Sequence, residues 1–141
     1  MSTPPFALAG LDHVVLLVDD LDRAQDFYLR VIGCTPGYSY PDIGMEQLWC
    51  GNALIGLWDI NHQAAAYRRP AVNGGRNVDH ICLALGPFEL DDLQAHLAAH
   101  GVAIERIEFQ GGARGMGHAV YIEDPFGNRL ELKGPPPHPL A

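Results

Sequence analysis

The sequence contains one pattern twice, and this internal repeat restricts the fold more than any other feature. Residues 11–18 and 78–85 match at an Asp-His pair and in the apolar run that follows it. Each run has the composition of a β-strand, and apolar residues at helical spacing follow it, over 19–32 and over 87–100. Asp19 or Asp20 is expected to cap the first helix, and glycines after each helix supply stop signals. The chain is therefore expected to consist of two similar halves.

Three short β-like runs follow each expected helix. They cover 35–40, 47–50 and 53–58 in the first half, and 104–109, 118–123 and 129–133 in the second. A Gly-Asn pair joins the last two runs of each half, at 51–52 and at 127–128, and suits a tight hairpin. Each half is therefore predicted to be a βαβββ module, and the fold class to be α+β. We expect one domain over 1–141, with modules at about 8–58 and 78–133, a linker and potential lid at 59–77, and a loose tail at 134–141.

Composition argues against several classes of protein. The 9 Lys and Arg residues against 17 Asp and Glu residues give a net charge of −8, so a nucleic-acid partner is not expected. No apolar run reaches the roughly 18 residues of a membrane span, and the N-terminal residues lack the pattern of a secretory signal, so a cytoplasmic protein is expected. The 3 cysteines form no CxxC motif and are interpreted as small core residues, not as a disulfide frame or a zinc site.

Side chains alternate between the two faces of a strand, and three side chains of the kinds that bind metal ions fall on the corresponding face of their strands. His13 and His80 occupy the same position of the two repeats, and Glu131 alternates with the apolar residues of the last strand. If the helices cover the opposite faces, all three side chains line one concave surface. Two imidazoles and one carboxylate suit divalent Fe, Mn, Zn, Ni or Co and leave positions open for a substrate. The alternative is a pair of hydrogen-bonded core histidines with a solvent-facing carboxylate.

These motifs resemble the vicinal oxygen chelate superfamily, which includes glyoxalase I, bleomycin-resistance proteins, fosfomycin-resistance thiol transferases, methylmalonyl-CoA epimerase and extradiol dioxygenases. The resemblance covers about residues 8–133. It rests on the two Asp-His segments, on Ala-Gln-Asp-Phe-Tyr at 24–28 with the glycine at 33, and on Tyr-Ile-Glu-Asp-Pro-Phe-Gly-Asn-Arg-Leu-Glu at 121–131. It implies a cup-shaped mixed sheet that closes around a metal ion held by His13, His80 and Glu131. It also implies a small substrate whose adjacent oxygens chelate that ion.

The first half departs from the pattern of two members of this superfamily. Glyoxalase I and the epimerase carry a further Glu or Gln ligand in the last strand of the first half. The repeat alignment offers Ile55 or Gly56 there, and neither can coordinate a metal. Glu46 or Gln47 on the preceding strand, or water, would have to take that place. This departure counts against both activities.

Other motifs leave the reaction class open. Residues 120–131 reproduce the second part of the extradiol signature, including Tyr121, but the histidine of its first part is missing. Val15 stands where the fosfomycin enzymes have a threonine. The resemblance therefore implies a metal-dependent lyase, isomerase or ring-cleaving dioxygenase. A non-catalytic drug-binding protein of the bleomycin-resistance type is the alternative.

Further side chains are candidates for the chemistry and for substrate binding. His118 and His62, with Tyr121, are candidate catalytic residues for proton transfer or substrate contact. Arg114 lies in the glycine-rich segment 111–117 and is a candidate for gripping an anionic group. The candidate apolar pocket residues are Trp49, Trp58 and Met45.

The resemblance also implies a homodimer with shared sites. His13 of one chain would then meet His80 and Glu131 of the other. A monomer whose own halves face one another is the alternative.

Overall fold

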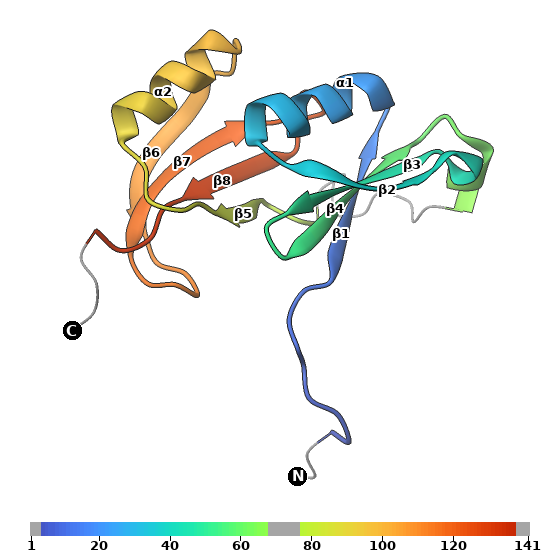
Figure 1. The fold of residues 1–141 in the computed structure, drawn as a ribbon, viewed down its shortest axis with the longest axis horizontal. Helices are drawn as coiled ribbons and strands as arrows, with labels where there is room; N and C mark the ends of the chain where they lie inside the picture. The colour runs from blue at the N-terminus through green and yellow to red at the C-terminus, as the bar shows by residue number, and fades with distance from the viewer. Residues whose placement is uncertain (1–3, 68–76, 138–141) are drawn as a thin grey trace.

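The computed structural model describes residues 4–67 and 77–137, which form two four-stranded mixed sheets (Figure 1). The first sheet has the order β1-β4-β3-β2, with β1 at His13–Val18, β2 at Thr35–Tyr40, β3 at Met45–Cys50 and β4 at Ala53–Asp59. The second has the order β5-β8-β7-β6, with β5 at Ile81–Ala84, β6 at Ile104–Gln110, β7 at Gly117–Glu123 and β8 at Arg129–Lys133. In each sheet the first strand pairs in parallel with the last, and the other pairs are antiparallel. The predicted α+β class and the βαβββ order are confirmed.

The helix of the first half has two parts. The α-helix α1 (Leu21–Asp26) continues directly into the π-helical segment η1 (Phe27–Ile32). Asp20 caps it, because its carboxylate accepts a hydrogen bond of 3.0 Å from the backbone N–H of Arg23. Gly33 ends it in a left-handed conformation with φ 89°, as its position in the sequence predicted.

The remaining helices of residues 4–67 and 77–137 are α2 and two short 3-10 segments. The helix α2 (Leu90–Ala99) occupies the equivalent place in the second half. The 3-10 segment η2 (Pro41–Ile43) joins β2 to β3, and η3 (Gln63–Tyr67) follows β4. None of the described helices is long and apolar enough to cross a membrane.

The two Gly-Asn hairpins differ. In the first half, β3 and β4 are joined by Gly51 and Asn52 alone, with φ 60° at the glycine, as predicted. In the second half the prediction of a tight turn was wrong, because five residues, 124–128, join β7 to β8. The carboxylate of Asp124 accepts hydrogen bonds from the backbone N–H groups of Phe126 and Asn128 and from the Asn128 amide. Side-chain bonding therefore closes the wider loop.

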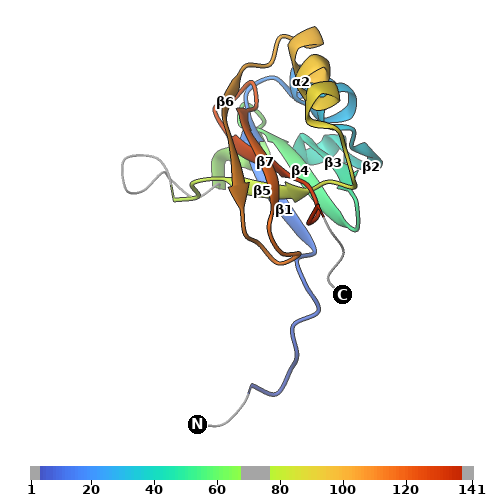
Figure 2. The same ribbon diagram turned by 90° about the vertical axis from the view of Figure 1, so that its left-hand side faces the viewer.

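One hydrophobic core lies between the helices and the sheets. Figures 1 and 2 show α1 and α2 on the same side of the sheets. Alternate strand residues and the helix residues that face them make up the core: Leu16, Val18, Ala24, Phe27, Tyr28, Cys34, Leu48, Ile55, Leu57, Leu83, Leu97, Val120, Ile122, Leu130 and Leu132. The opposite face of the first sheet is poorly covered within the chain, since Val15 is 38% and Leu17 is 40% exposed. Such an apolar sheet face requires a ligand or a second protein surface.

A buried hydrogen bond joins the two halves at this core. The hydroxyl of Tyr28, in η1, donates to the Asp124 carboxylate at 2.7 Å across 96 residues of sequence. Burial and the neighbouring Asp124 carboxylate both raise the pKa of Tyr28, so the hydroxyl keeps its proton and remains a donor. The bond therefore fixes the first helix against the β7–β8 loop.

Parts of the expected connections lie outside the described residues. These parts are 68–76 of the predicted linker, which contain the Arg68-Arg69 pair, and 138–141 of the predicted tail. At the other end of the chain, residues 4–12 leave the body of the molecule as an extended arm (Figure 2).

Replacing Tyr28 with Phe tests the bond between the halves. The variant keeps the ring but leaves a buried carboxylate oxygen with one donor fewer, so the free energy of unfolding should fall by about 1.5–3 kcal/mol. Urea denaturation followed by far-UV circular dichroism measures this change. Tyr38→Phe, at the exposed edge strand β2, is the matched control and should change the free energy of unfolding little. Equal effects of the two substitutions would contradict the assigned role of the Tyr28 hydroxyl.

Candidate metal centre

His80 and Glu131 meet on the face of the second sheet that the helices do not cover. His80 immediately precedes β5, and Glu131 lies in β8, the strand that pairs with β5. The His80 Nε2 atom lies 3.1 Å from the Glu131 Oε2 atom. The helix-covered side of the same strands carries Leu83, Leu130 and Leu132, which belong to the core. The alternation expected from the sequence therefore holds in this half.

The aspartate that precedes each histidine orients its ring. The Nδ1 atom of His80 lies 2.6 Å from the Asp79 carboxylate, and the Nδ1 atom of His13 lies 2.5 Å from the Asp12 carboxylate. The hydrogen bond with His80 is the main cause that lowers the pKa of Asp79. When Nδ1 donates its proton to the carboxylate, Nε2 of a neutral ring keeps a lone pair for a metal ion. Both repeats present their histidine in this way.

The arrangement of donor atoms around Glu131 fits a cation. The side chain is 5% exposed, and its Oε1 atom is buried with no hydrogen-bond partner among the described residues. A carboxylate oxygen and an imidazole lone pair that face each other repel unless a proton or a cation lies between them. Glu131 and His80 therefore have the donor chemistry for a divalent metal ion such as Zn or Fe.

A cavity of about 300 Å³ opens at this pair. Its walls come from β5, β8 and the glycine-rich loop between β6 and β7, and include His80, Cys82, Ala84, Leu85, Gly111, Gly112, Ala113, Arg114, Glu131, Lys133 and Gly134. Arg114 is thus in the same cavity as two of the expected metal ligands. The buried Lys133 donates a 2.6 Å hydrogen bond from its Nζ atom to the backbone oxygen of Gly115, and so holds the loop down. Two cationic side chains therefore lie beside the cavity.

His13 lies apart from this cavity. It begins β1, in the first sheet, opposite Leu54 of β4, and its side chain is 46% exposed. Among residues 4–67 and 77–137, no three His, Cys, Asp or Glu side chains come close enough to hold a metal ion. The expectation that the three ligands line one surface is therefore not met within a single chain.

The strand register identifies the first-half counterpart of Glu131. Glu131 lies opposite Cys82, two residues beyond His80, whereas Val15, two residues beyond His13, lies opposite Gly56. Gly56, and not Ile55, therefore occupies the position of the further ligand. A Cβ atom there would lie 3.2 Å from a methyl carbon of Val15, so a larger residue would be crowded.

The sequence offers two residues of β3, Glu46 and Gln47, as substitutes for the further metal ligand of the first half. Gln47 lies opposite Gly56 and so shares the face of His13. Glu46, its neighbour, points to the other face, where it accepts a 2.6 Å hydrogen bond from the Ser39 hydroxyl. Of the two side chains, only Gln47 faces the same way as His13.

Tyr121 and Cys82 complete the surroundings of Glu131. Tyr121 lies opposite Glu131 in β7, its ring contacts His80 edge to face at 5.7 Å, and the Arg106 guanidinium lies 4.2 Å from its ring centre. Burial and the charge of Glu131 raise the pKa of Tyr121, so its hydroxyl stays protonated. Cys82 is exposed on this face, so its interpretation as a core residue was wrong. Its strand position alternates with those of the core residues.

The two other candidate histidines do not reach the cavity. His118 lies three residues before Tyr121 in β7, so it points to the opposite face, and its ring packs against Phe109 at 5.4 Å. His62 lies beyond β4, where its Nδ1 atom accepts a 3.1 Å hydrogen bond from the backbone N–H of Ala64. The structure gives both side chains local packing roles.

The candidate apolar residues belong to the first half and share the face of His13. Met45, Trp49 and Trp58 face away from the core residues Leu48 and Leu57 by strand alternation. The Trp58 indole also donates a 2.9 Å hydrogen bond to the backbone oxygen at position 43. These apolar side chains therefore lie on the same face as His13, whereas charged side chains line the cavity at His80.

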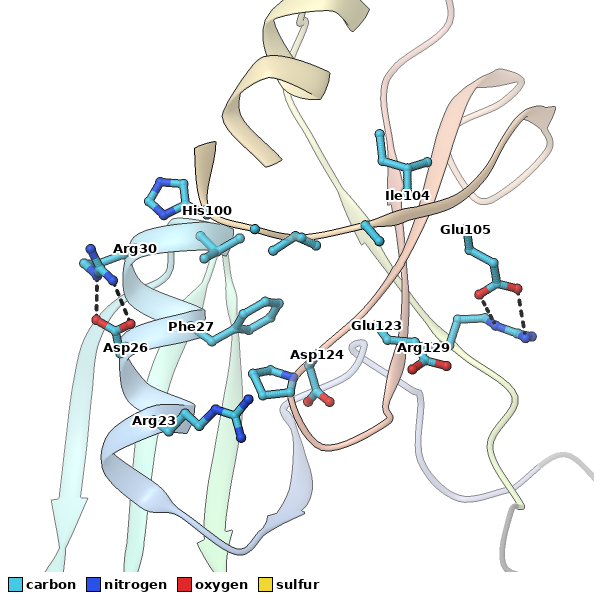
Figure 3. Close-up of a pocket in the computed structure, with 15 residues that line it drawn as sticks. Arg23, Asp26, Phe27, Arg30, His100, Ile104, Glu105, Glu123, Asp124 and Arg129 are labelled. Atoms are coloured by element: carbon cyan, nitrogen blue, oxygen red, sulfur yellow. Dashed lines mark hydrogen bonds and ion pairs between the residues drawn. The ribbon is translucent and has the colours of Figure 1, made fainter. Parts of the chain in front are cut away.

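A larger hollow of about 650 Å³ lies elsewhere, between α1, η1 and the second sheet (Figure 3). Its charged walls are largely paired: Arg30 binds Asp26, and Arg129 binds Glu105. None of the residues predicted for the site lines it. Volume alone therefore does not identify the site here.

The sequence interpretation had missed three contributors. Asp12 and Asp79 were visible as half of each Asp-His pair, but no role had been given to them. Lys133 was predicted to share the face of Glu131, since the two are two residues apart in one strand, yet its bond to the glycine-rich loop depends on tertiary structure.

The comparisons with known proteins agree with this fold. A sequence profile of the Glyoxalase/Bleomycin resistance protein/Dioxygenase superfamily matches residues 10–132, so the chain belongs to this superfamily. The glyoxalase domain-containing protein RDO1 of Mycosarcoma maydis is 29% identical over 130 residues, covering 89% of this chain and 68% of that protein.

Two solved structures illustrate the likeness of fold. An integron cassette protein from the mobile metagenome of V. cholerae has a TM-score of 0.70 and 27% identity, over 92% of this chain and 97% of that one. A lactoylglutathione lyase from Agrobacterium tumefaciens has a TM-score of 0.67 and 25% identity, over 91% and 95% of the two chains. The similarity therefore extends over nearly the whole chain.

Replacing Lys133 with Met should loosen the glycine-rich loop. The variant keeps the aliphatic stem and loses the hydrogen bond to Gly115, which should raise the open population of the loop about fivefold. Limited trypsin digestion measures this as faster cleavage after Arg114. Cleavage after Arg30, in the helix of the first half, is the internal reference and should not change. An unaltered ratio of the two cleavage rates would show that Lys133 does not hold the loop.

Proposed function

We propose that this protein is a metal-dependent enzyme that acts on a small oxygenated molecule, which binds the metal ion through adjacent oxygens. The observation that carries the proposal is the buried Glu131 carboxylate, which lies 3.1 Å from the His80 Nε2 atom and has one oxygen without a partner among the described residues. A buried carboxylate in this state is costly unless a cation neutralises it. Membership of the superfamily supports the same function.

His80 and Glu131 of one chain, with His13 of the partner subunit, would hold the ion. This assignment is supported by the separation of His13 from the other two in a single chain and by the matching Asp-His geometry of both repeats. It is also supported by the exposed apolar face around His13, which a second chain would cover. The ligand set suits divalent Fe, Mn, Zn, Ni or Co. Gln47 is the side chain best placed to add a further donor on the His13 side.

When bound, the metal would act as a Lewis acid and stabilise negative charge that develops on a substrate oxygen. Arg114 would bind an anionic group of the substrate, and Lys133 would hold the loop that carries Arg114. The protonated Tyr121 hydroxyl beside Glu131 would donate a hydrogen bond to the substrate. The apolar side chains around His13 would exclude water from the closed site.

Two reaction classes fit this arrangement, and the identity of the metal that each needs distinguishes them. Glyoxalase-type lyase or isomerase chemistry needs only a Lewis acid and a proton acceptor. Ring-cleaving dioxygenase chemistry needs Fe(II) and consumes oxygen, so oxygen uptake on catechols would select it. A non-catalytic small-molecule binder is the competing function, and it would be favoured if the protein bound none of the five metals.

Metal loading and subunit exchange together test the proposed centre. The purified protein, supplied in turn with Fe(II), Mn, Ni, Co and Zn, should retain close to one ion per chain, measured by elemental analysis after desalting. His13→Ala and Glu131→Ala should each lose the ion. After exchange of equal amounts of these two variants, half of the dimers are mixed, and one site in each mixed dimer is intact. About one quarter of the wild-type capacity should therefore return.

The same experiment contains its own controls. Each single variant carried through the exchange procedure alone should recover nothing. His100→Ala removes a histidine at the end of α2, away from the cavity, and should keep the ion. No recovery in a verified mixed dimer would rule out the shared site, and no metal in the wild-type protein would overturn the metal-dependent function itself.

Arg114 should determine the affinity for anionic ligands. In a thermal-shift screen of small carboxylates and phosphates on metal-loaded protein, Arg114→Ala should lower affinity by about tenfold or more, because a charge-assisted contact is lost. The matched control is Arg106→Ala, which removes a nearby guanidinium that stacks on Tyr121 and does not line the cavity. Unchanged affinity for every anionic hit in the Arg114 variant would refute the recognition role.

A further inference from the structure

Two cysteines of the first half are cross-strand neighbours. Thr35 of β2 lies opposite Trp49 of β3, and β2 and β3 are antiparallel. Continuing this register by one residue places Cys34 opposite Cys50. Both side chains pack against the same core: Cys34 is 7% exposed, and Cys50 is partly buried. The interaction between the two thiols is the largest cause of both of their pKa shifts. Neither cysteine forms a disulfide in this structure.

The backbone geometry at this pair suits a disulfide. The Cys34 N–H group donates to the Tyr28 carbonyl at 2.9 Å, so Cys34 does not donate a ladder hydrogen bond to Cys50. In a non-hydrogen-bonded antiparallel pair the Cα atoms lie about 4.5 Å apart. Disulfides usually join Cα atoms that are about 4.4–6.8 Å apart. The pair therefore needs no large backbone movement to close.

The surroundings of the two thiols shift their pKa values in opposite directions. The hydrogen bond from Cys34 lowers the pKa of Cys50 to about 7, against the opposing effect of burial, whereas the pKa of Cys34 is raised. Cys50 is also the more accessible of the two. A thiolate is the reactive form, so Cys50 should be the attacking thiol of this chain.

We propose that Cys34 and Cys50 are a peroxide-sensitive modification site, which hydrogen peroxide converts reversibly to a disulfide. The Cys50 thiolate attacks one peroxide oxygen, the O–O bond breaks, and the products are Cys50 sulfenic acid and one water after protonation. The Cys34 sulfur then attacks the sulfenic sulfur, the S–O bond breaks, and the hydroxide leaves as water with the Cys34 proton. In total the two thiols lose two protons and two electrons, and one peroxide becomes two waters. A dithiol such as dithiothreitol reverses the change by exchange.

The site is independent of the proposed metal centre and lies on the opposite side of its sheet. It adjoins the bond between the halves, because Cys34 hydrogen-bonds the backbone of Tyr28, whose hydroxyl binds Asp124. Closing the disulfide would tie the end of η1 to the end of β3. Oxidation would therefore act on the junction of the two halves.

The test counts thiols in the intact protein before and after treatment with hydrogen peroxide. The reduced, denatured chain should take up three molecules of N-ethylmaleimide, one for each of its 3 cysteines. The peroxide-treated chain should take up one, on Cys82, and should be lighter by two hydrogen masses before alkylation. Digestion with trypsin together with a glutamate-specific protease cuts after Glu46 and after Arg76 and so places the three cysteines on three separate peptides. The peptides of Cys34 and Cys50 should stay joined until dithiothreitol is added.

Variants separate the two steps. In Cys34→Ser, dimedone should label Cys50 as a sulfenic acid, whereas Cys50→Ser should give no label at position 34 at the same peroxide dose. Cys82→Ser should form the disulfide at the wild-type rate. The proposal is overturned if the wild-type chain keeps three alkylatable thiols, if Cys82 is oxidised first, or if the joined peptides contain Cys82. These outcomes are read on wild-type protein, so a misfolded variant does not leave the proposal untested.

Discussion

The buried carboxylate of Asp124 shapes the loop between β7 and β8 and links the two halves of the chain. It is buried and accepts hydrogen bonds from two backbone N–H groups, from the Asn128 amide and from the Tyr28 hydroxyl. The first three bonds shape the loop that leads into β8, the strand of Glu131. The fourth anchors this loop to the helix of the first half. A buried carboxylate requires such donors, so one residue couples the position of a candidate ligand strand to the packing of the two halves.

The two halves share a scaffold and differ in what their uncovered faces carry. Both repeats orient a histidine through the preceding aspartate. The second half adds Glu131, Arg114 and Lys133 around a cavity, whereas the first half has Gly56 at the equivalent position and apolar side chains nearby. Among the residues that the structure describes, neither face brings together three His, Cys, Asp or Glu side chains that could hold a metal ion. This division of donors between halves is the physical basis for proposing that two chains contribute to each centre.

The thiol pair and the candidate metal centre use opposite faces of the sheets. Cys34 and Cys50 lie on the helix-covered side of the first sheet, where the strand register makes them neighbours. Cys82 lies on the uncovered side of the second sheet, where desolvation and the adjacent Glu131 carboxylate raise the pKa of its thiol. The three cysteines thus have different chemistry although all follow similar apolar segments. Their surroundings, and not their local sequence, separate them.

The sequence by itself determined the features that depend on local spacing. The repeat predicted both modules, the alternation of Leu130, Glu131 and Leu132 predicted which side chains leave the core, and Gly33 and Gly51 matched backbone conformations that favour glycine. The same alternation would have excluded His118, which lies an odd number of positions from Tyr121. The five-residue loop at Asp124 was missed although the hydrogen bonds that shape it are local, because the Gly-Asn pair was interpreted as a two-residue turn. Its anchoring to Tyr28, 96 residues away, depends on tertiary structure. Only the tertiary structure decided that His13 lies apart from His80 and Glu131, because sheet-to-sheet placement depends on long-range packing that no local pattern encodes.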